Sequence, residues 1–458
     1  MKNFHLLAAL CCTFILSNTF AQSHNWTGNG GDSDWFNTAN WDSGTVPIET
    51  STVSIVGNVM VLISGSSAEA YTIDLHNNAT LEMQSNLETQ SIITVHDSGT
   101  FIFTTGVLSG SGVHNFGLLK VEGINTRTFS NTSVTNHADF LVTNSNQTQL
   151  FNTTINNMTT GLIDISSVGG FLQQNQSSVI NNDGLLRKSP DGLNPFGTFY
   201  LITEINNQGT IEVQEDQTFL LLAGSSTFTN FENGRVTGNG VYDITTNFVN
   251  HGLVLPGGDE TVGSLDVTNN FSLNGGIVSI DMAGTANGEF DSIVVVGGPQ
   301  MEGALDINLL FEPQVGDEFE VITWNLSGSN CNFPQFTTAI RDGFEYTFET
   351  FCNANDVTLR MVGVSVLGFE DLGKEEVQFY VYPNPVSETG HFVFSSEFIA
   401  SETSKVVLYN ALGQQVSARQ GISPGSDTFE RGNLPGGLYF AQLEDEGRVL
   451  ATTRIVID

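Results

Sequence analysis

The central part of the chain repeats a short unit made of asparagine, one to four further residues, a small residue and then an alternating apolar run. Seven copies place the small residue at these positions: Gly117, Ala138, Gly161, Gly184, Gly209, Gly234 and Gly252. The successive spacings are 21, 23, 23, 25, 25 and 18 residues. A period of about twenty indicates a solenoid, in which each repeat forms one coil that buries its apolar face only against neighbouring coils.

The residue types within the unit favour strands over helices. Val, Ile, Leu, Phe and Thr in short alternating runs are strand formers, whereas Asn and Gly provide the left-handed or otherwise unusual backbone angles of corners. We therefore predict an all-β fold, with a right-handed parallel β-helix and its C-terminal cap over residues 51–362. Asn-Gly pairs also favour hairpins, so a stack of antiparallel sheets is the alternative. We expect the recurring asparagines to form a hydrogen-bonded ladder inside the coils.

A tryptophan-rich segment, residues 22–50, precedes the repeats. Three of the four tryptophans lie there: Trp26, Trp35 and Trp41. The segment resembles the opening of β-helical regions in secreted and autotransporter-like adhesins. We predict a cap that covers the open end of the solenoid, and a carbohydrate-stacking platform is the alternative. Asp32 and Asp34, spaced as Asp-x-Asp in a Gly-rich loop, are a weak Ca²⁺ signal.

The N-terminal residues 1–21 are typical of a secretory signal peptide. Lys2 precedes an apolar run from Leu6 to Leu16, and a polar stretch leads to cleavage after Ala21. The apolar run is too short to span a bilayer, and no later segment approaches the length of a membrane helix. We therefore expect an exported protein without a transmembrane segment.

Residues 250–361 carry a pattern of their own. A Pro-Gly corner, an Asn-rich strand, a Phe-Asp strand and a Gly-Asp-x-Phe turn follow one another. This order resembles the C-terminal part of autotransporter-like passenger β-helices, which implies a scaffold and a cap and identifies no reaction. Cys331 and Cys352 are the only cysteines outside the signal peptide. Because the periplasm is oxidising, we predict that they form a disulfide, which would contribute about 3 kcal/mol.

The last part of the chain consists of short strands and tight turns. A Gly-containing, charged linker at residues 363–377 leads to a domain at residues 378–458 with the runs VYPNPVSETGHFVF, VVLYNALGQQV and LPGGLYFAQLEDEGRVLATTRIVID. We predict a small Ig-like β-sandwich. Its motif residues lie in or beside the turns: Pro383, Asn384, Pro385, Asn410, Leu412, Gly413, Leu434, Gly437, Leu438 and Tyr439.

This domain is similar to the type A C-terminal sorting domain of the type IX secretion pathway. The resemblance implies recognition by the outer-membrane translocon and its sortase, removal of the tail, and either attachment to surface lipopolysaccharide or release. It also implies passage through the periplasm to the extracellular face of the outer membrane or to the medium. The chain ends in Asp458, where such domains commonly end in a basic residue.

The charge of the chain excludes some partners. The formal net charge is −35 at pH 7, with 14 basic against 49 acidic residues. Nucleic acids and anionic lipids need clustered Lys and Arg, so we expect neither as a partner. The acidic residues are scattered, which is typical of a solvated surface; weak binding of divalent cations is the alternative.

Many β-helices cleave polysaccharides, and two kinds of site were considered. A lyase needs a basic residue beside several Ca²⁺-binding acids, and none of the few cations in the repeats has an acidic cluster directly after it: Lys120, Arg127, Arg187, Lys188 and Arg235. A glycosidase needs two carboxylates a few ångströms apart. Five acidic residues of the repeats are candidates, although spacing alone does not bring them together: Asp164, Asp183, Glu212, Glu215 and Asp216.

Motifs of other catalytic classes are absent, including the Gly-x-Ser-x-Gly elbow, His-Glu-x-x-His and phosphate-binding loops. Five dispersed histidines precede residue 140, and none has metal-ligand spacing: His24, His76, His96, His114 and His137. We therefore predict no catalytic, cofactor or metal site. The sequence favours a non-enzymatic adhesin-like or structural surface protein that contacts a glycan or matrix, with a carbohydrate-active β-helix as the alternative.

Overall fold

The computed structural model describes residues 22–143, 146–175, 178–192, 197–222, 227–269, 271–326, 330–366, 379–394, 400–401, 403–422, 428–445 and 447–458. The predicted signal peptide and its cleavage point at Ala21 lie outside these residues. The chain divides into two compact units, Met1–Ser365 and Val366–Asp458. Within the described ranges the helical structure is limited to one 3-10 turn, η1 (Thr38–Asn40), so the prediction of an all-β fold is confirmed.

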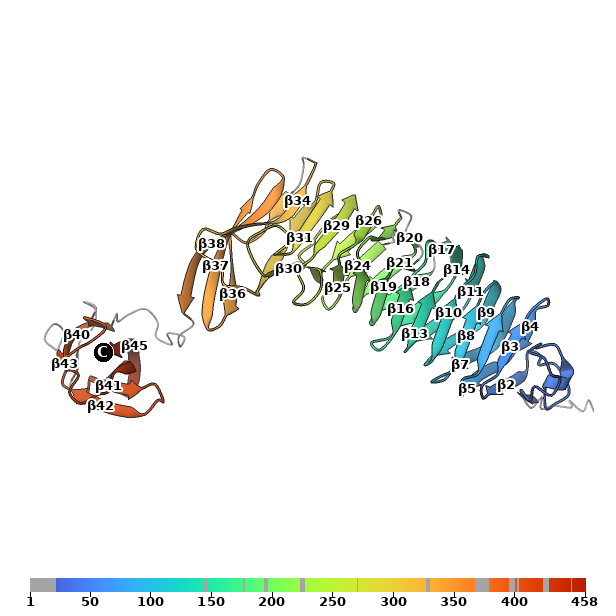
Figure 1. Cartoon of the computed structure of the whole chain (residues 1–458), viewed down its shortest axis with the longest axis horizontal. Helices are drawn as coiled ribbons and strands as arrows, with labels where there is room; N and C mark the ends of the chain where they lie inside the picture. Colours follow the sequence, from blue (N-terminus) through green and yellow to red (C-terminus); the bar gives the residue numbers. More distant parts are fainter. Residues whose placement is uncertain are drawn as a thin grey trace, which may run out of the picture. The chain divides into compact units, whose positions relative to one another are not determined.

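The first unit is a β-solenoid whose coils each contain three short strands (Figure 1). One coil consists of β14 (Gln147–Phe151), β15 (Thr154–Asn157) and β16 (Leu162–Ile165). Each of these strands pairs in parallel with its counterpart in the next coil. The parallel pairing confirms the β-helix and excludes the antiparallel alternative for the repeats.

One side of the solenoid is a twelve-stranded parallel sheet. Its strands are β3 (Met60–Ile63), β6 (Thr80–Met83), β8 (Thr100–Phe103), β10 (Leu118–Val121), β13 (Asp139–Val142), β16, β19 (Leu185–Lys188), β22 (Thr210–Val213), β25 (Arg235–Gly238), β28 (Leu253–Pro256), β30 (Ile277–Met282) and β33 (Ala304–Leu309). The strands pair in the order in which the chain forms them.

A second side, the asparagine face, carries the Asn-rich strands. It contains β1 (Gln22–Asn25), β2 (Ser51–Val56), β5 (Thr72–His76), β7 (Leu87–Val95), β9 (Gly106–Asn115), β12 (Ser133–Asn136), β15, β18 (Val179–Asn182), β21 (Glu204–Asn207), β24 (Thr227–Asn230) and β27 (Asn247–Asn250). All neighbouring pairs are parallel.

The third side begins with β4 (Ala68–Ala70) and shares β7 and β9 with the asparagine face. It continues through β11 (Arg127–Ser130), β14, β17 (Gly169–Asn175), β20 (Gly197–Ile202), β23 (Gln217–Leu221), β26 (Val241–Ile244), β29 (Ser264–Asn269), β31 (Ser292–Val296) and β34 (Glu318–Trp324). The solenoid therefore has a triangular set of sheets around one core.

Antiparallel strands close the C-terminal end of the solenoid. β34 pairs with β38 (Asp356–Val366), and β36 (Phe336–Arg341) pairs with β37 (Phe344–Cys352). A short parallel pair, β32 (Gln300–Glu302) and β35 (Asn330–Asn332), lies beside them. Because β38 extends to Val366, the first four residues of the predicted linker belong to a strand, and residues 367–377 lie outside the described residues.

The core follows from the two-residue period of the strands. In β16 and β19 the second and fourth residues point inward and are buried. They are Ile163 and Ile165 in β16, and Leu186 and Lys188 in β19. Aromatic side chains from successive coils also meet inside, and the rings of Phe171 and Phe199 make an edge contact at 5.3 Å. Full burial of one such side chain stabilises the fold by roughly 1.5–3 kcal/mol.

A column of buried asparagines lies inside the corner that follows the asparagine face. Each amide nitrogen except that of the last member donates to the side-chain oxygen of the asparagine one coil later, at 2.6–2.8 Å; the column consists of Asn115, Asn136, Asn157, Asn182, Asn207, Asn230 and Asn250. The predicted internal ladder is thereby confirmed. These amides also donate to backbone oxygens of the corner, so buried carbonyl groups of the turn have side chains as their hydrogen-bond partners.

The glycines of the repeat are needed for a different reason from the one predicted. None of Gly161, Gly184 and Gly209 has a left-handed φ angle. A Cβ atom at Gly184 would instead overlap the carbonyl oxygen of Gly161, and one at Gly209 would overlap that of Gly184. Close stacking of corners, and not a left-handed φ angle, therefore requires glycine there.

The second unit contains two small antiparallel sheets. One consists of β39 (Phe379–Tyr382), β40 (Thr389–Phe394) and β43 (Thr428–Glu430). The other consists of β41 (Lys405–Asn410), β42 (Gln415–Gln420), β44 (Gly437–Asp445) and β45 (Arg448–Ile457). Their apolar faces share a core that includes Phe392, Leu408 and Ile455.

Candidate functional site

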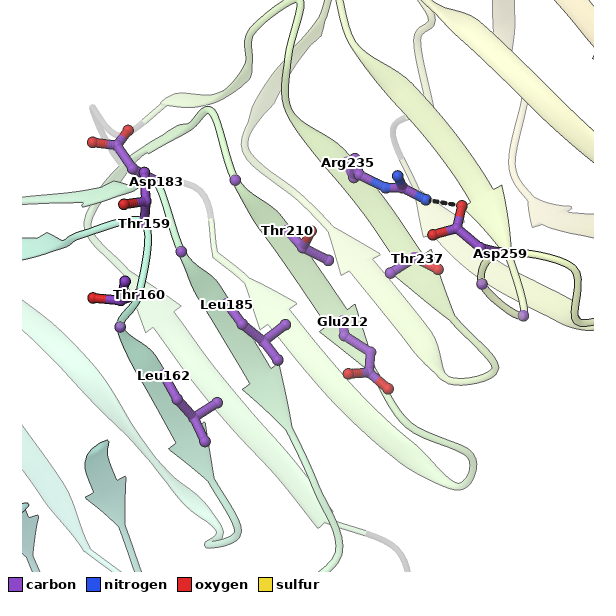
Figure 2. A pocket seen from close by; sticks show the side chains of 15 residues that line it. Thr159, Thr160, Leu162, Asp183, Leu185, Thr210, Glu212, Arg235, Thr237 and Asp259 are labelled. Atoms are coloured by element: carbon purple, nitrogen blue, oxygen red, sulfur yellow. Dashed lines mark hydrogen bonds and ion pairs between the residues drawn. The ribbon is translucent and has the colours of Figure 1, made fainter. Parts of the chain in front are cut away.

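A shallow groove of about 660 Å³ crosses the outer face of the twelve-stranded sheet (Figure 2). Outward side chains at the first position of β16, β19, β22 and β25 follow one another in register along it: Leu162, Leu185, Thr210 and Arg235. Glu212 and Thr237, at the third positions of β22 and β25, also line the groove, and turn residues such as Thr160, Asp183 and the Gly257–Asp259 segment form the rest. The groove therefore offers a mixed apolar and hydroxyl surface that extends over several coils.

Two arginines on this face pair with aspartates of neighbouring coils. Arg235 forms an ion pair with Asp259 at one side of the groove (Figure 2). Beside the groove, Arg187 Nη2 donates to Asp164 at 2.6 Å, and Ser189 Oγ donates to the same carboxylate at 2.6 Å. The hydrogen bond with Asp164 raises the pKa of Arg187. Asp164 is consequently held by two donors and is not a free base.

The five acidic residues considered for catalysis come from different places. Asp164 and Glu212 lie on β16 and β22, with Arg187 of β19 in register between them. Asp183 follows β18, and Figure 2 shows it on the side of the groove away from Asp259. Glu215 and Asp216 line a second hollow of about 500 Å³, which Glu212 also lines. Glu212 is thus the one of the five acidic residues that lines both hollows.

The cations considered for lyase chemistry are largely engaged. Lys120 pairs with Glu122 at 2.5 Å. Arg127 and Lys188 point into the core, where burial lowers the pKa of Arg127 to about 10 and that of Lys188 to about 8. Lys188 Nζ donates to Gln217 Oε1 at 2.6 Å. Among the five predicted cations, Arg235 is the one that lines the groove.

The tryptophan-rich segment packs inward. Trp35 and Trp41 are 0 % and 3 % exposed, their rings meet edge to face at 5.0 Å, and Trp41 Nε1 donates to the Trp35 carbonyl at 2.8 Å. This burial supports the predicted cap and is incompatible with a carbohydrate platform made of these two rings. Asp32 accepts hydrogen bonds from Asn37 and Asn40 at 2.8 and 2.7 Å, and these bonds lower the pKa of Asp32.

The predicted disulfide between Cys331 and Cys352 is present. It joins β35 to the end of β37 in the cap of the solenoid.

Two histidines that are distant in sequence lie side by side. The rings of His76 and His96 stack with their centroids 3.8 Å apart, and His96 Nε2 lies 3.0 Å from Asp74 Oδ1. The sequence did not predict this cluster, because the usual metal-site signal is a set of ligands only a few residues apart. The detectable signal is the separation of twenty residues, which equals one coil.

The tail motif residues hold the turns of the second unit. Asn384 donates to the Arg454 carbonyl at 2.9 Å and accepts from the Val456 amide at 2.7 Å, which fastens the Pro383–Pro385 segment to the last strand. Asn410 Oδ1 accepts from the amides of Leu412 and Gln414, each at 3.0 Å. The two asparagines therefore have clear structural roles.

Some of the other motif residues stabilise the domain, and others are exposed at its surface. Gly413 has a φ angle of +75°, which the turn after β41 requires. Tyr439 is buried and its hydroxyl donates to the Pro435 carbonyl at 2.9 Å. Leu412 is 84 % exposed at the tip of its turn. Leu434 lines a small hollow of about 450 Å³, and Leu438 and Gly437 lie at the exposed start of β44. 

The second unit is thus a small antiparallel domain with a clamped Pro-Asn-Pro segment. Residues 380–458 match the family described as secretion system C-terminal sorting domain. The domain is the one recognised by the type IX secretion machinery, as predicted. No curated protein matches the chain.

The sorting domain indicates export to the cell surface or the extracellular space. It also implies an interaction with the type IX machinery. In the part of the chain that the structure covers, no helix has the length and apolar character needed to cross a membrane.

Proposed function

We propose that the exported solenoid is a non-enzymatic, adhesin-like or structural surface protein, and that the groove on its twelve-stranded sheet contacts an extended extracellular glycan. The observation that supports this most is the pairing of charges across coils. Asp164 is held by Arg187 and Ser189, and Asp259 is held by Arg235. General acid or base chemistry needs a carboxyl group that is placed to exchange a proton with substrate.

The shape and lining of the groove suit binding along a polymer. The groove is shallow and crosses successive parallel strands, which are about 4.8 Å apart. Hydroxyl groups of Thr160 and Thr210 provide hydrogen-bond partners, and Leu162 and Leu185 provide apolar contact. A sugar chain lying across the coils would meet one outward side chain of this row at each step, first Leu162 and Leu185, then Thr210 and Arg235.

A binding assay with matched variants tests this function. Immobilised glycans of neutral and acidic type are exposed to the purified full chain, to Thr210→Lys with its long side chain in the groove, and to Thr229→Lys on the asparagine face. We expect Thr210→Lys to lose binding while Thr229→Lys retains it. Equal binding by both variants, or no binding by the unmodified protein to any glycan or matrix component, contradicts the proposal.

The second candidate function is that of a carbohydrate-active β-helix. The position of Glu212, which lines both hollows, favours this candidate. Asp164 and Glu212 lie two coils apart, so the strand spacing separates their backbones by about 9.5 Å. That value is at the upper end of the carboxylate separation in inverting glycosidases. Arg187 between them is the feature that opposes this candidate.

The fate of the tail belongs to the same proposal. We infer that the tail is removed after passage through the outer membrane, and that the solenoid is then attached to surface lipopolysaccharide or released. Support comes from the sorting domain, which is a compact unit separate from the solenoid. Mass measurement of the surface-exposed protein tests the removal, because an intact chain that retains residues 380–458 would contradict it.

A further inference from the structure

We propose that Asp74, His76 and His96 form a binding site for a divalent transition-metal ion such as Zn²⁺. Their potential ligand atoms all lie within 4.8 Å of one another, and all three side chains are half-buried on the outer surface. Among the described residues this is the one group of three such ligands with that separation. The site lies on the asparagine face, apart from the groove of the proposed function.

The coil geometry explains how the three ligands meet. Asp74 and His76 are two residues apart on β5, so both point to the same side of the strand. β7 stacks on β5 with Leu75 opposite Val95, and the His96 amide donates to the Leu75 carbonyl at 3.0 Å. His96 is therefore placed directly beside His76, one coil further on.

One of the ligand separations is close to that of a loaded site, and the others are within 4.8 Å. Zinc bonds of about 2.0–2.2 Å in tetrahedral geometry separate ligand atoms by about 3.4 Å. His96 Nε2 and Asp74 Oδ1 are 3.0 Å apart, a separation that one bridging hydrogen spans. Replacing that hydrogen with a metal ion requires only a small rotation of the side chains, with the imidazole proton then on Nδ1 of His96.

The donor set selects the class of metal. Two imidazole nitrogens and one carboxylate suit Zn²⁺, Cu²⁺ or Ni²⁺, whereas Ca²⁺ prefers an all-oxygen site. Three protein ligands leave a coordination position for water or for a group on a partner. The next side chains in the same row are Val56 and Phe116, which are exposed and carry no charge. No cation therefore competes within that row.

Isothermal titration calorimetry of the metal-free full chain with Zn²⁺ tests the site. We expect one Zn²⁺ per chain, and we expect His76→Gln and His96→Gln each to weaken binding by at least about tenfold. His137→Gln is the matched control, because His137 stacks on Phe116 in the same row at 4.6 Å. Excess Ca²⁺ should not displace the bound Zn²⁺.

A spectroscopic measurement identifies the ligands directly. Electron paramagnetic resonance of the Cu²⁺ form should show coupling to two imidazole nitrogens, and to one in His96→Gln. Circular dichroism checks that the variants retain the strand signal. Equal Zn²⁺ affinity of the unmodified protein and the double variant, displacement by Ca²⁺, or no binding at all overturns the proposal.

Discussion

The amide nitrogen of Asn157 donates a hydrogen bond to the side-chain oxygen of Asn182 at 2.8 Å, from one coil to the next, and both side chains are fully buried. Asn182 in turn donates to Asn207 at 2.7 Å. Because each residue is both donor and acceptor, the ladder continues only if every coil supplies an asparagine at the same place. The register of the corners is thereby coupled along the solenoid.

Removing one rung should therefore be costly. Asn182→Leu removes the acceptor of the Asn157 amide and the donor to Asn207 Oδ1, together with the bonds from Asn182 to the Gly184 and Thr210 carbonyls. Each buried group that is left unsatisfied costs about 1–3 kcal/mol. We expect the free energy of unfolding to fall by about 2–5 kcal/mol in denaturant titrations. Asn181→Ser is the control: Asn181 makes an outward bond to Asn156 at 2.8 Å, and we expect its loss to cost less than about 1 kcal/mol. Equal effects would contradict the role of the ladder.

The sequence was sufficient to predict these coils, because asparagine recurs at one period and apolar residues alternate after it. The local pattern was less reliable for single positions. The side chain of Lys188 points into the core, between Ile165 and Val213 of the neighbouring coils. The local sequence around Lys188 does not show which of its side chains face the core. The sequence locates the repeat glycines, but the predicted left-handed φ is not what requires them; overlap with the neighbouring coil does, and that is a property of stacking and not of local sequence.

The groove could not be predicted, because it depends on which outward residues share a register across coils. Arg235 meets Asp259 only because the turn after β28 returns toward β25. His76 and His96 meet for the same reason, through parallel stacking of β5 and β7. The right-handed sense of the solenoid stays a prediction.

Asp291 should make stability depend on pH. Its carboxylate is fully buried and accepts from the amides of Gly263 at 2.7 Å and Asp281 at 2.9 Å, and burial raises its pKa from 3.8 to about 7. Between these values the unfolded chain has lost the proton that the folded chain keeps. Raising the pH through this window therefore lowers stability, by up to about 4 kcal/mol above pH 7, and the penalty is absent below about pH 4.

Asp291→Asn isolates this contribution. The amide cannot ionise, so the stability of the variant relative to the unmodified protein should increase from pH 4 to 7 and then level off. A constant offset is expected in addition, because the amide places a donor opposite a backbone donor. Thermal unfolding of both proteins over this pH range measures the difference, and parallel curves would be inconsistent with a raised pKa.

The disulfide should stabilise the cap locally. In the double variant Cys331→Ser and Cys352→Ser, we expect a loss of about 3 kcal/mol in the stability of the cap, from the chain entropy of the open loop. Hydrogen exchange should accelerate in β35 and β37 and remain unchanged in β15 and β18. A reductant should affect the unmodified protein in the same way and leave the double variant unaltered; uniform acceleration in all strands would refute a local effect.

The sorting domain should be necessary for export. Deleting residues 381–458 should leave the solenoid in the periplasm. Asn384→Ala removes both bonds to the last strand and should reduce surface delivery in part, whereas Gln415→Ala on exposed β42 should not. Fractionation with protease accessibility of intact cells measures delivery. Normal surface exposure of the deleted chain would contradict the sorting role.

The most direct test of a non-enzymatic surface solenoid is product analysis after incubation with polysaccharides. The purified full chain, Glu212→Gln and Asp164→Asn are each incubated with a panel of neutral and acidic polysaccharides, and new reducing ends and unsaturated products are measured. We predict no product above the protein-free control for any of the three proteins. Reproducible cleavage that is lost in Glu212→Gln or Asp164→Asn would contradict the account and identify the carbohydrate-active alternative.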